Sequence, residues 1–139
     1  MRVKNYDIFI SHSRKIGANQ VAHLIYDRLK FDFSVYLDLN VTEAGKFDEL
    51  LEEHIKNCQD FILIVTEDLF KKNTSSWVLK ELVWADKYKK NIIPIFLDGH
   101  QCDFTKVPSE LCLIEKTNWI EYHEKQFDDV IKSIIKMLQ

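Results

Sequence analysis

The chain contains few of the residues that usually mark linkers and tight turns. Only 3 glycines and 2 prolines occur among its 139 residues, and no repeat, low-complexity segment or Pro/Gly-rich spacer divides it. A hydrophobic share of 46% with 29% charged residues is typical of a globular protein and excludes a disordered one. We therefore expect a single domain that spans residues 1–139.

Long apolar runs and an excess of positive charge are also missing. No apolar stretch reaches the ~18 residues that a membrane-spanning helix needs, and the first residues, MRVKNYDIF, lack the apolar core of a signal peptide. The formal net charge is −3 and no basic block stands out, which makes nucleic acid a poor candidate partner. These absences predict a cytoplasmic domain that binds neither a membrane nor nucleic acid.

Cysteine is scarce, and its spacing suggests neither a disulfide framework nor a metal site. Cys58, Cys102 and Cys112 are odd in number and form no CxxC pair, so reduced thiols in a cytosolic protein are expected. His100 lies close to Cys102, but two potential ligands in one loop, without a second pair, are weak support for zinc. We expect no bound metal.

Short apolar runs alternate with amphipathic helical patterns along the whole chain. The run DFILIVT is apolar at consecutive positions, as expected of a central parallel strand that is covered on both faces. The alternation predicts an α/β fold of the doubly wound, flavodoxin-like type, with a five-stranded parallel sheet in the order 2-1-3-4-5 and helices on both faces. Strands are expected at Tyr6–Ser11, Ser34–Asp38, Asp60–Thr66, Asn91–Leu97 and Thr117–Tyr122, helices around residues 21–29, 47–58, 74–90 and 127–138, and one short helix near Ser109–Leu113.

Sheets of this type bind ligands beyond the carboxyl ends of their strands, where the strand order reverses. That crevice is expected between the first and third strands, lined by Ser11–Lys15, Asp38–Gly45 and Thr66–Trp77.

Neither GxGxxG nor GxxxxGK[ST] follows the first strand, which excludes a Rossmann dinucleotide site and a P-loop. SHS and TED stand where a phospho-acceptor receiver domain has its acidic cluster and its acceptor aspartate, so that chemistry lacks its carboxylates.

One helical pattern carries a carboxylate in an apolar position. On a helical wheel of TSSWVLKELVWADKYKK, Glu81 falls between Trp77, Tyr88 and Ala85. A glutamate in such a position is most often partly exposed to solvent or paired with a Lys or Arg from elsewhere in the chain. The alternative is a catalytic carboxylate, because this helix follows the loop after the third strand and so lies beside the expected crevice.

Four motifs, in order and at family spacing, resemble the TIR (Toll/interleukin-1 receptor) domain family. They are YDIFISHS, VYLDLNVTEAGKFDELLEEHIKNCQDFILIVT, SSWVLKELVWA and NIIPIF. The similarity covers nearly the whole chain and is closest in texture to bacterial TIR domains. It implies either an adaptor that signals through TIR–TIR contacts or an enzyme that cleaves NAD+ at the nicotinamide–ribose bond. The enzymes carry a glutamate in a W-x-x-x-E arrangement, which Trp77 and Glu81 match.

A single carboxylate is chemically sufficient for that cleavage. Glycoside hydrolases normally use two, because a poor alcohol leaving group must be protonated, whereas the pyridinium of NAD+ departs as neutral nicotinamide. One carboxylate near the ribose could accept hydrogen bonds from its hydroxyls and stabilise the developing oxocarbenium charge. We therefore expect Glu81 to be the catalytic residue, with NAD+ as the substrate and no cofactor.

Further residues are expected around the substrate. After the first strand, backbone N–H groups and a cation suit a pyrophosphate, and an indole face suits a cationic or aromatic base. Turn, cap or core roles stay open for each residue except Glu81. The candidates for NAD+ binding are Ser11, His12, Ser13, Arg14, Asp38, Phe47 and Trp77.

The resemblance also assigns a role in assembly to the segment after the second strand. In many TIR assemblies this loop docks on a neighbouring protomer and helps to complete the active site. In the sequence LNVTEAGKF the glycine is kept, but the Pro-Gly pair and the arginine of animal adaptors are absent, which suits a bacterial enzyme better. The candidate assembly residues are Asn40, Thr42, Gly45 and Lys46.

These observations together predict an NAD+ hydrolase, an effector in bacterial anti-phage defence that becomes active when protomers self-associate. Two alternatives stay open, a non-enzymatic adaptor and a cyclase or base-exchange enzyme that makes a cyclic ADP-ribose isomer. The same glutamate serves any nucleophile that meets the ribosyl cation, so the residues do not separate these products. A start close to the first strand favours a TIR domain at the N-terminus of a larger protein, with a fused or separate sensor.

Overall fold

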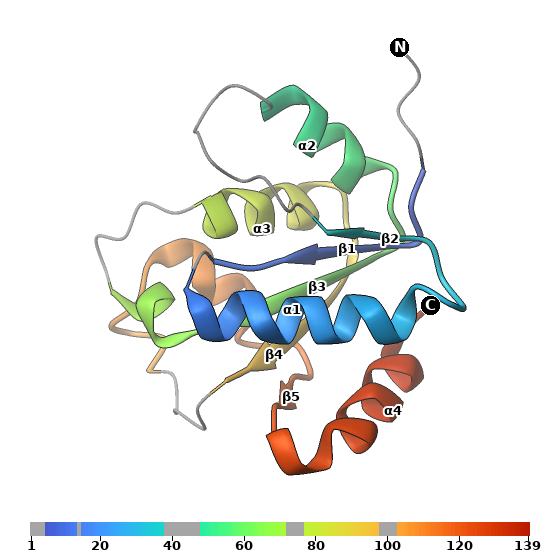
Figure 1. The fold of residues 1–139 in the computed structure, drawn as a ribbon. Coiled ribbons are helices and arrows are strands. Elements are labelled where there is room, and N and C mark those ends of the chain that lie inside the picture. The colour runs from blue at the N-terminus through green and yellow to red at the C-terminus, as the bar shows by residue number, and fades with distance from the viewer. Residues whose placement is uncertain (1–4, 14, 38–47, 72–76, 98–102) are drawn as a thin grey trace.

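The computed structural model describes residues 5–13, 15–37, 48–71, 77–97 and 103–139. Within these ranges, five parallel strands form one sheet in the order β2-β1-β3-β4-β5 (Figure 1). They are β1 (Ile8–Ser11), β2 (Val35–Leu37), β3 (Asp60–Val65), β4 (Asn91–Phe96) and β5 (Ile120–Glu121). The predicted fold class and strand order are both confirmed.

Helices cover both faces of this sheet (Figure 1). One face carries α1 (Ile16–Leu29) and α4 (Phe127–Met137), and the other carries α2 (Asp48–Lys56) and α3 (Trp77–Lys87). The described connections contain three short 3-10 helices, η1 (Glu67–Phe70), η2 (Ser109–Ile114) and η3 (Glu124–Gln126). Of these, η2 confirms the short helix predicted near Ser109–Leu113, and it packs against α3.

Alternation along the strands divides the apolar residues between two cores, because successive side chains of a strand point to opposite faces. The core under α1 and α4 takes Ile8, Ile10, Ile62, Ile64, Ile93 and Ile95, and the core under α2 and α3 takes Phe9, Phe61, Leu63, Val65 and Phe96. Full burial of a side chain of this size stabilises the fold by about 1.5–3 kcal/mol. The same alternation places Ser11, two residues after Phe9, on the face that carries α3.

The central strand holds the carboxyl end of β1 in place. All six residues of β3 are buried, as expected of a parallel strand that is covered on both faces. β1 pairs with β3 on one side, where Ser11 is in register with Leu63, and with β2 on the other. The backbone of Ser11 is therefore fixed by the interior of the sheet.

Each strand is shorter than the range predicted for it, and the local hydrogen bonds of β1 and β5 are informative. β1 begins at Ile8, because the backbone N–H groups of Asp7 and Ile8 both donate to the Ser34 carbonyl oxygen and the Asp7 carboxylate accepts from the Ser34 N–H. These contacts join the residue before β1 to the residue before β2. β5 contains only Ile120 and Glu121, since Thr117 still bonds back to Ile114 at the end of η2.

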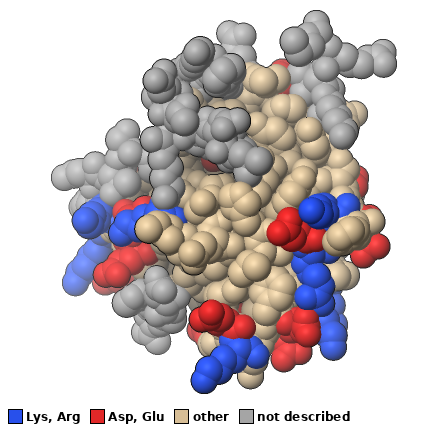
Figure 2. Space-filling model, in the orientation of Figure 1, with Lys and Arg blue, Asp and Glu red and all other residues tan. Residues whose placement is uncertain are grey.

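The described surface is mixed in charge. On the face shown in Figure 2, acidic and basic side chains are interspersed, and no broad patch carries a single sign. Arg28 of α1 forms an ion pair of this kind with Asp128 of α4, with 2.7 Å between nitrogen and oxygen. No helix in the described part of the chain combines the length and the apolar character that crossing a membrane requires.

Candidate active site

Glu81 is one of two buried carboxylates among the described residues. Its side chain is 5% exposed and lies in the second turn of α3, where Val78, Leu82 and Ala85 are also buried. Removing a carboxylate from water costs free energy unless donors or cations satisfy it. The Ser11 hydroxyl is such a donor, because its Oγ donates to Glu81 Oε1 at 2.7 Å.

Strand geometry explains why Ser11 and Glu81 meet. Ser11 ends β1 and points to the same side of the strand as Phe9, whose ring belongs to the core under α2 and α3. Glu81 follows the first residue of α3, Trp77, by about one helical turn. The carboxylate is thus held where β1 ends, at the edge of the sheet where folds of this class bind their ligands.

The second buried carboxylate, Asp60, lies at the opposite edge of the sheet. It begins β3 and accepts hydrogen bonds from the Asn91 side chain at 2.7 Å and from the Gln139 backbone N–H at 3.1 Å. Burial raises the pKa of Asp60, and the hydrogen bond from Asn91 opposes that rise. These contacts join the start of β3 to the start of β4 and to the end of the chain, so we assign Asp60 a structural role.

His12 and Ser13 continue from β1 along the same edge and make local turn contacts. The Nδ1 atom of His12 donates to the Ser13 carbonyl oxygen at 2.9 Å, which makes Nδ1 the protonated nitrogen of the ring. The Ser13 hydroxyl accepts from the Lys15 backbone N–H at 3.4 Å, just before α1 begins. Both side chains are half-buried. These local contacts do not test the predicted contacts of His12 and Ser13 with NAD+, which stay predictions.

Trp77 lies at the start of α3 in an aromatic and cationic cluster. Its ring is half-buried, and its centroid is 6.4 Å from that of Trp84. The Lys80 ammonium lies over both rings, 4.8 Å from the centroid of Trp77 and 5.4 Å from that of Trp84. Because an indole face attracts a cation, this contact places a positive charge on one face of the Trp77 ring.

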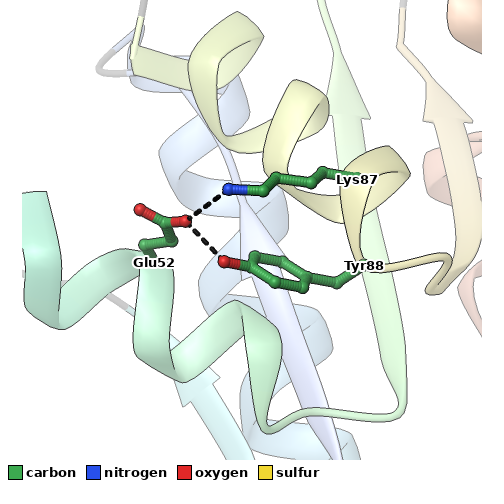
Figure 3. A network of polar contacts seen from close by, with 3 residues as sticks. All are labelled: Glu52, Lys87 and Tyr88. Atoms are coloured by element: carbon green, nitrogen blue, oxygen red, sulfur yellow. Dashed lines mark hydrogen bonds and ion pairs between the residues drawn. The ribbon is translucent and has the colours of Figure 1, made fainter.

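The sequence prediction that Tyr88 lies beside Glu81 is wrong. Tyr88 follows Glu81 by about two helical turns, or about 10 Å along the helix axis, and its hydroxyl donates to Glu52 of α2 at 2.6 Å (Figure 3). Lys87 donates to the same carboxylate oxygen at 3.3 Å. The hydrogen bond from Tyr88 lowers the pKa of Glu52, burial opposes this, and Lys87 lowers the pKa further. Tyr88 therefore joins α3 to α2.

The described thiols show no sign of reactive chemistry. Cys58 is buried, its thiol donates to the Ile55 carbonyl oxygen at 3.1 Å, and burial raises its pKa to about 12. Cys112 is exposed, and both thiols are free. Within the described ranges, no group of three His, Cys, Asp or Glu side chains is arranged to hold a metal ion. His100 and Cys102 lie outside those ranges.

A hollow lies at the same edge of the sheet, on the other face. It has a volume of about 340 Å³ and is lined by the first turns of α1 together with Leu97, Tyr122 and Glu124. Leu97 belongs to the core under α1 and α4. The hollow and Glu81 are thus separated by the layer of the sheet, so Glu81 does not line it.

A comparison with family models decides the family. The model described as the TIR domain matches residues 8–135. The chain belongs to the TIR domain family. The resemblance seen in the four sequence motifs is therefore confirmed, and the W-x-x-x-E arrangement of this TIR domain lies on the first turns of α3.

Curated relatives and solved structures agree with this assignment. The chain is 32% identical to a zebrafish (Danio rerio) protein named NAD(+) hydrolase SARM1, over 98% of the chain and 20% of the relative. It is also 32% identical to NAD(+) hydrolase tir-1 of Caenorhabditis elegans, over 99% of the chain and 15% of the relative. The TIR domains of the activated Roq1 resistosome share its fold, with a TM-score of 0.67 and 17% identity over 95% of this chain and 98% of theirs. The chain thus spans a fifth or less of the length of these two curated relatives.

The described residues bring together only part of the predicted site of this TIR domain. Glu81 and Ser11 are in contact, Trp77 is one turn before Glu81, and His12 and Ser13 follow Ser11 along the edge. The other predicted residues lie outside the described ranges. They are Arg14, Asp38 and Phe47 of the expected NAD+ site, and Asn40, Thr42, Gly45 and Lys46 of the expected assembly loop.

One contact of the candidate site was not predicted from the sequence. The sequence predicted either NAD+ binding or a turn or cap role for Ser11, whereas in the structure its hydroxyl donates to Glu81. The sequence does indicate that Ser11 faces the interior. Ser11 and Phe9 lie on the same side of a strand, and the apolar side chain of Phe9 predicts that this side is covered. What the sequence did not show is which helix covers that face.

Proposed function

We propose that this TIR domain cleaves NAD+ at the nicotinamide–ribose bond, with Glu81 as the catalytic carboxylate. The bond between the ribose C1′ and the pyridinium nitrogen breaks, and its electron pair passes to the nitrogen, which leaves as neutral nicotinamide. The negative charge of Glu81 stabilises the positive charge that develops on the ribose. Water then bonds to C1′ and releases a proton to solvent, which gives ADP-ribose. NAD+ is the substrate and no step requires a cofactor.

The burial of Glu81 at the ligand-binding edge is the observation that carries this proposal. A carboxylate that is 5% exposed acts in surroundings of low dielectric constant, where its attraction for a nearby cation is stronger than in water. Its neighbour Trp77 already has one face against an ammonium group, a chemistry that also suits a pyridinium ring. The names of the two curated relatives, both NAD(+) hydrolases, support the same reaction.

The proposal extends to activation by self-association. The TIR domains of the structural neighbour belong to an activated resistosome, which supports an assembled active state for this domain. We further propose a cytoplasmic effector of bacterial anti-phage defence that works with a fused or separate sensor. The bacterial setting rests on sequence texture alone, and the two relatives named above come from a fish and a nematode.

The test is nicotinamide release from NAD+ by the purified domain, at high protein concentration or with a crowding agent. Glu81→Gln keeps the shape of the side chain and removes its charge. Asp86→Asn is the matched control, because Asp86 is an exposed acid on the same helix. We expect kcat to fall by at least about 100-fold in Glu81→Gln and to stay unchanged in Asp86→Asn.

The products decide between the remaining functions. Chromatography of the reaction mixture separates ADP-ribose from a cyclic ADP-ribose isomer, and added pyridine bases reveal base exchange. Wild-type activity in Glu81→Gln would contradict the catalytic assignment. A wild-type domain that assembles but releases no nicotinamide would favour the non-enzymatic adaptor.

A further inference from the structure

The hydroxyl of Ser11 is enclosed by protein. Its residue is 1% exposed, so solvent does not satisfy the hydroxyl, and a buried donor without a partner would cost free energy. Its bond to Glu81 Oε1 measures 2.7 Å between oxygens. That length lies within the range for a hydroxyl that donates to a charged carboxylate, about 2.5–2.7 Å.

The two ends of this bond differ in stiffness. Ser11 is the last residue of β1 and is in register with Leu63 of the buried strand β3, and its hydroxyl has one side-chain torsion to adjust. Glu81 reaches the bond through three side-chain torsions from a helix, and each has several favoured values. A bond between a stiff donor and a flexible acceptor restricts mainly the acceptor.

We propose that Ser11 is a positioning residue that holds the Glu81 carboxylate in its catalytic orientation. This inference rests on the proposed cleavage of NAD+ by Glu81. In this role the Ser11 hydroxyl is bonded to Glu81 and needs no contact with the substrate. Ser11 acts instead by fixing the carboxylate relative to the sheet. A displacement of about 1 Å at a catalytic group is sufficient to lower a rate strongly.

A positioning role and a substrate-binding role affect kinetics differently. Loss of a substrate contact that is equal in the ground state and the transition state raises KM and leaves kcat unchanged. Loss of carboxylate orientation lowers kcat, because the carboxylate acts on charge that develops only in the transition state. For Ser11→Ala we expect kcat to fall by about tenfold, with KM for NAD+ unchanged within about twofold.

The conservative variant and a remote control complete the test. Ser11→Thr keeps the hydroxyl and should restore most of kcat, whereas a merely steric role for Ser11 would make threonine worse than alanine. Thr117→Val is the control, because it removes a hydroxyl whose partner is the Ile114 carbonyl oxygen. We expect wild-type kinetics from Thr117→Val. If the melting transition shows that Ser11→Ala does not fold, Ser11→Cys is used instead, because a thiol is a weaker donor of similar size. An unchanged kcat in Ser11→Cys would overturn the proposal.

A double-mutant comparison separates positioning from a general loss of stability. Glu81→Asp withdraws the carboxylate from the reach of Ser11, so Ser11→Ala should have almost no further effect on kcat in that background. Additive losses would overturn the proposal, as would a Ser11→Ala enzyme with wild-type kcat or with a change in KM alone. Failure of the proposed function looks different, since Glu81→Gln would then be as active as wild type, or the assembled wild type would be inactive.

Discussion

Shortening Glu81 by one methylene group tests the geometry of the site directly. In Glu81→Asp the charge is retained, but the carboxylate moves back towards α3 by about 1.5 Å, the length of one carbon–carbon bond. The distance from the Ser11 hydroxyl, 2.7 Å in the wild type, would then become about 4 Å, which is beyond hydrogen-bond range. The carboxylate would lose the hydrogen bond from Ser11 and the position beside the ribose that we propose for it.

The expected kinetic consequence of Glu81→Asp is large. A misplacement of about 1 Å lowers a rate by about 100-fold, so kcat for nicotinamide release should fall by about that factor, or about 2.7 kcal/mol in activation free energy. The assay is the initial rate of nicotinamide release at saturating NAD+, with the melting temperature measured on the same preparation to confirm folding. An aspartate variant with kcat within about threefold of wild type would refute the reasoning, because a carboxylate at either distance would then serve.

Two further predictions concern the helix that carries Glu81. Leu82→Ala should lower the free energy of unfolding by about 2–5 kcal/mol, because Leu82 is fully buried. Val83→Ala, at an exposed position, should change it by less than about 0.5 kcal/mol. Urea titration measures both variants, and equal effects would contradict the observed packing of α3. Tyr88→Phe should raise the pKa of Glu52 towards its ordinary value, because the hydrogen bond from Tyr88 is the main cause of its lowering, and NMR titration of the carboxyl carbon would show no shift if that cause is wrong. Since the folded state favours the ionised Glu52, its contribution to stability is present above the unfolded-state pKa and is lost as the pH falls through the lowered folded-state pKa.

The layout of the sheet could be predicted because two independent sequence signals agree on it. The consecutive apolar residues of β3 indicate a strand with both faces covered, and parallel crossovers restrict where the helices return. The strand order places the residues after β1 at the ligand-binding edge, and Ser11 lies there. These properties depend on residue type and spacing alone.

The surroundings of α3 could not be predicted from a helical wheel. A wheel gives the angle of a side chain but not its height along the helix, so Tyr88 and Glu81 were placed together although Tyr88 contacts Glu52 at the other end. A wheel also does not show which elements other than the sheet pack against the helix. Leu79 is 2% exposed, and it lies in the same core as Leu111 and Ile114 of η2, which packs against α3 in addition to the sheet. The sequence predicted a short helix near Ser109–Leu113 in this connection, but it did not show that this helix packs against α3.

Alternation in β1 makes the contact between Ser11 and Glu81 depend on the number of residues in one short strand. Phe9 and Ser11 face α3 because they are two positions apart. Inserting or deleting one residue between them would turn the hydroxyl towards α1 and leave Glu81 without that donor, even if the sheet re-formed around the change. The even positions of this strand therefore pack beneath α1, whereas the odd positions place Phe9 in the core under α2 and α3 and the Ser11 hydroxyl against Glu81.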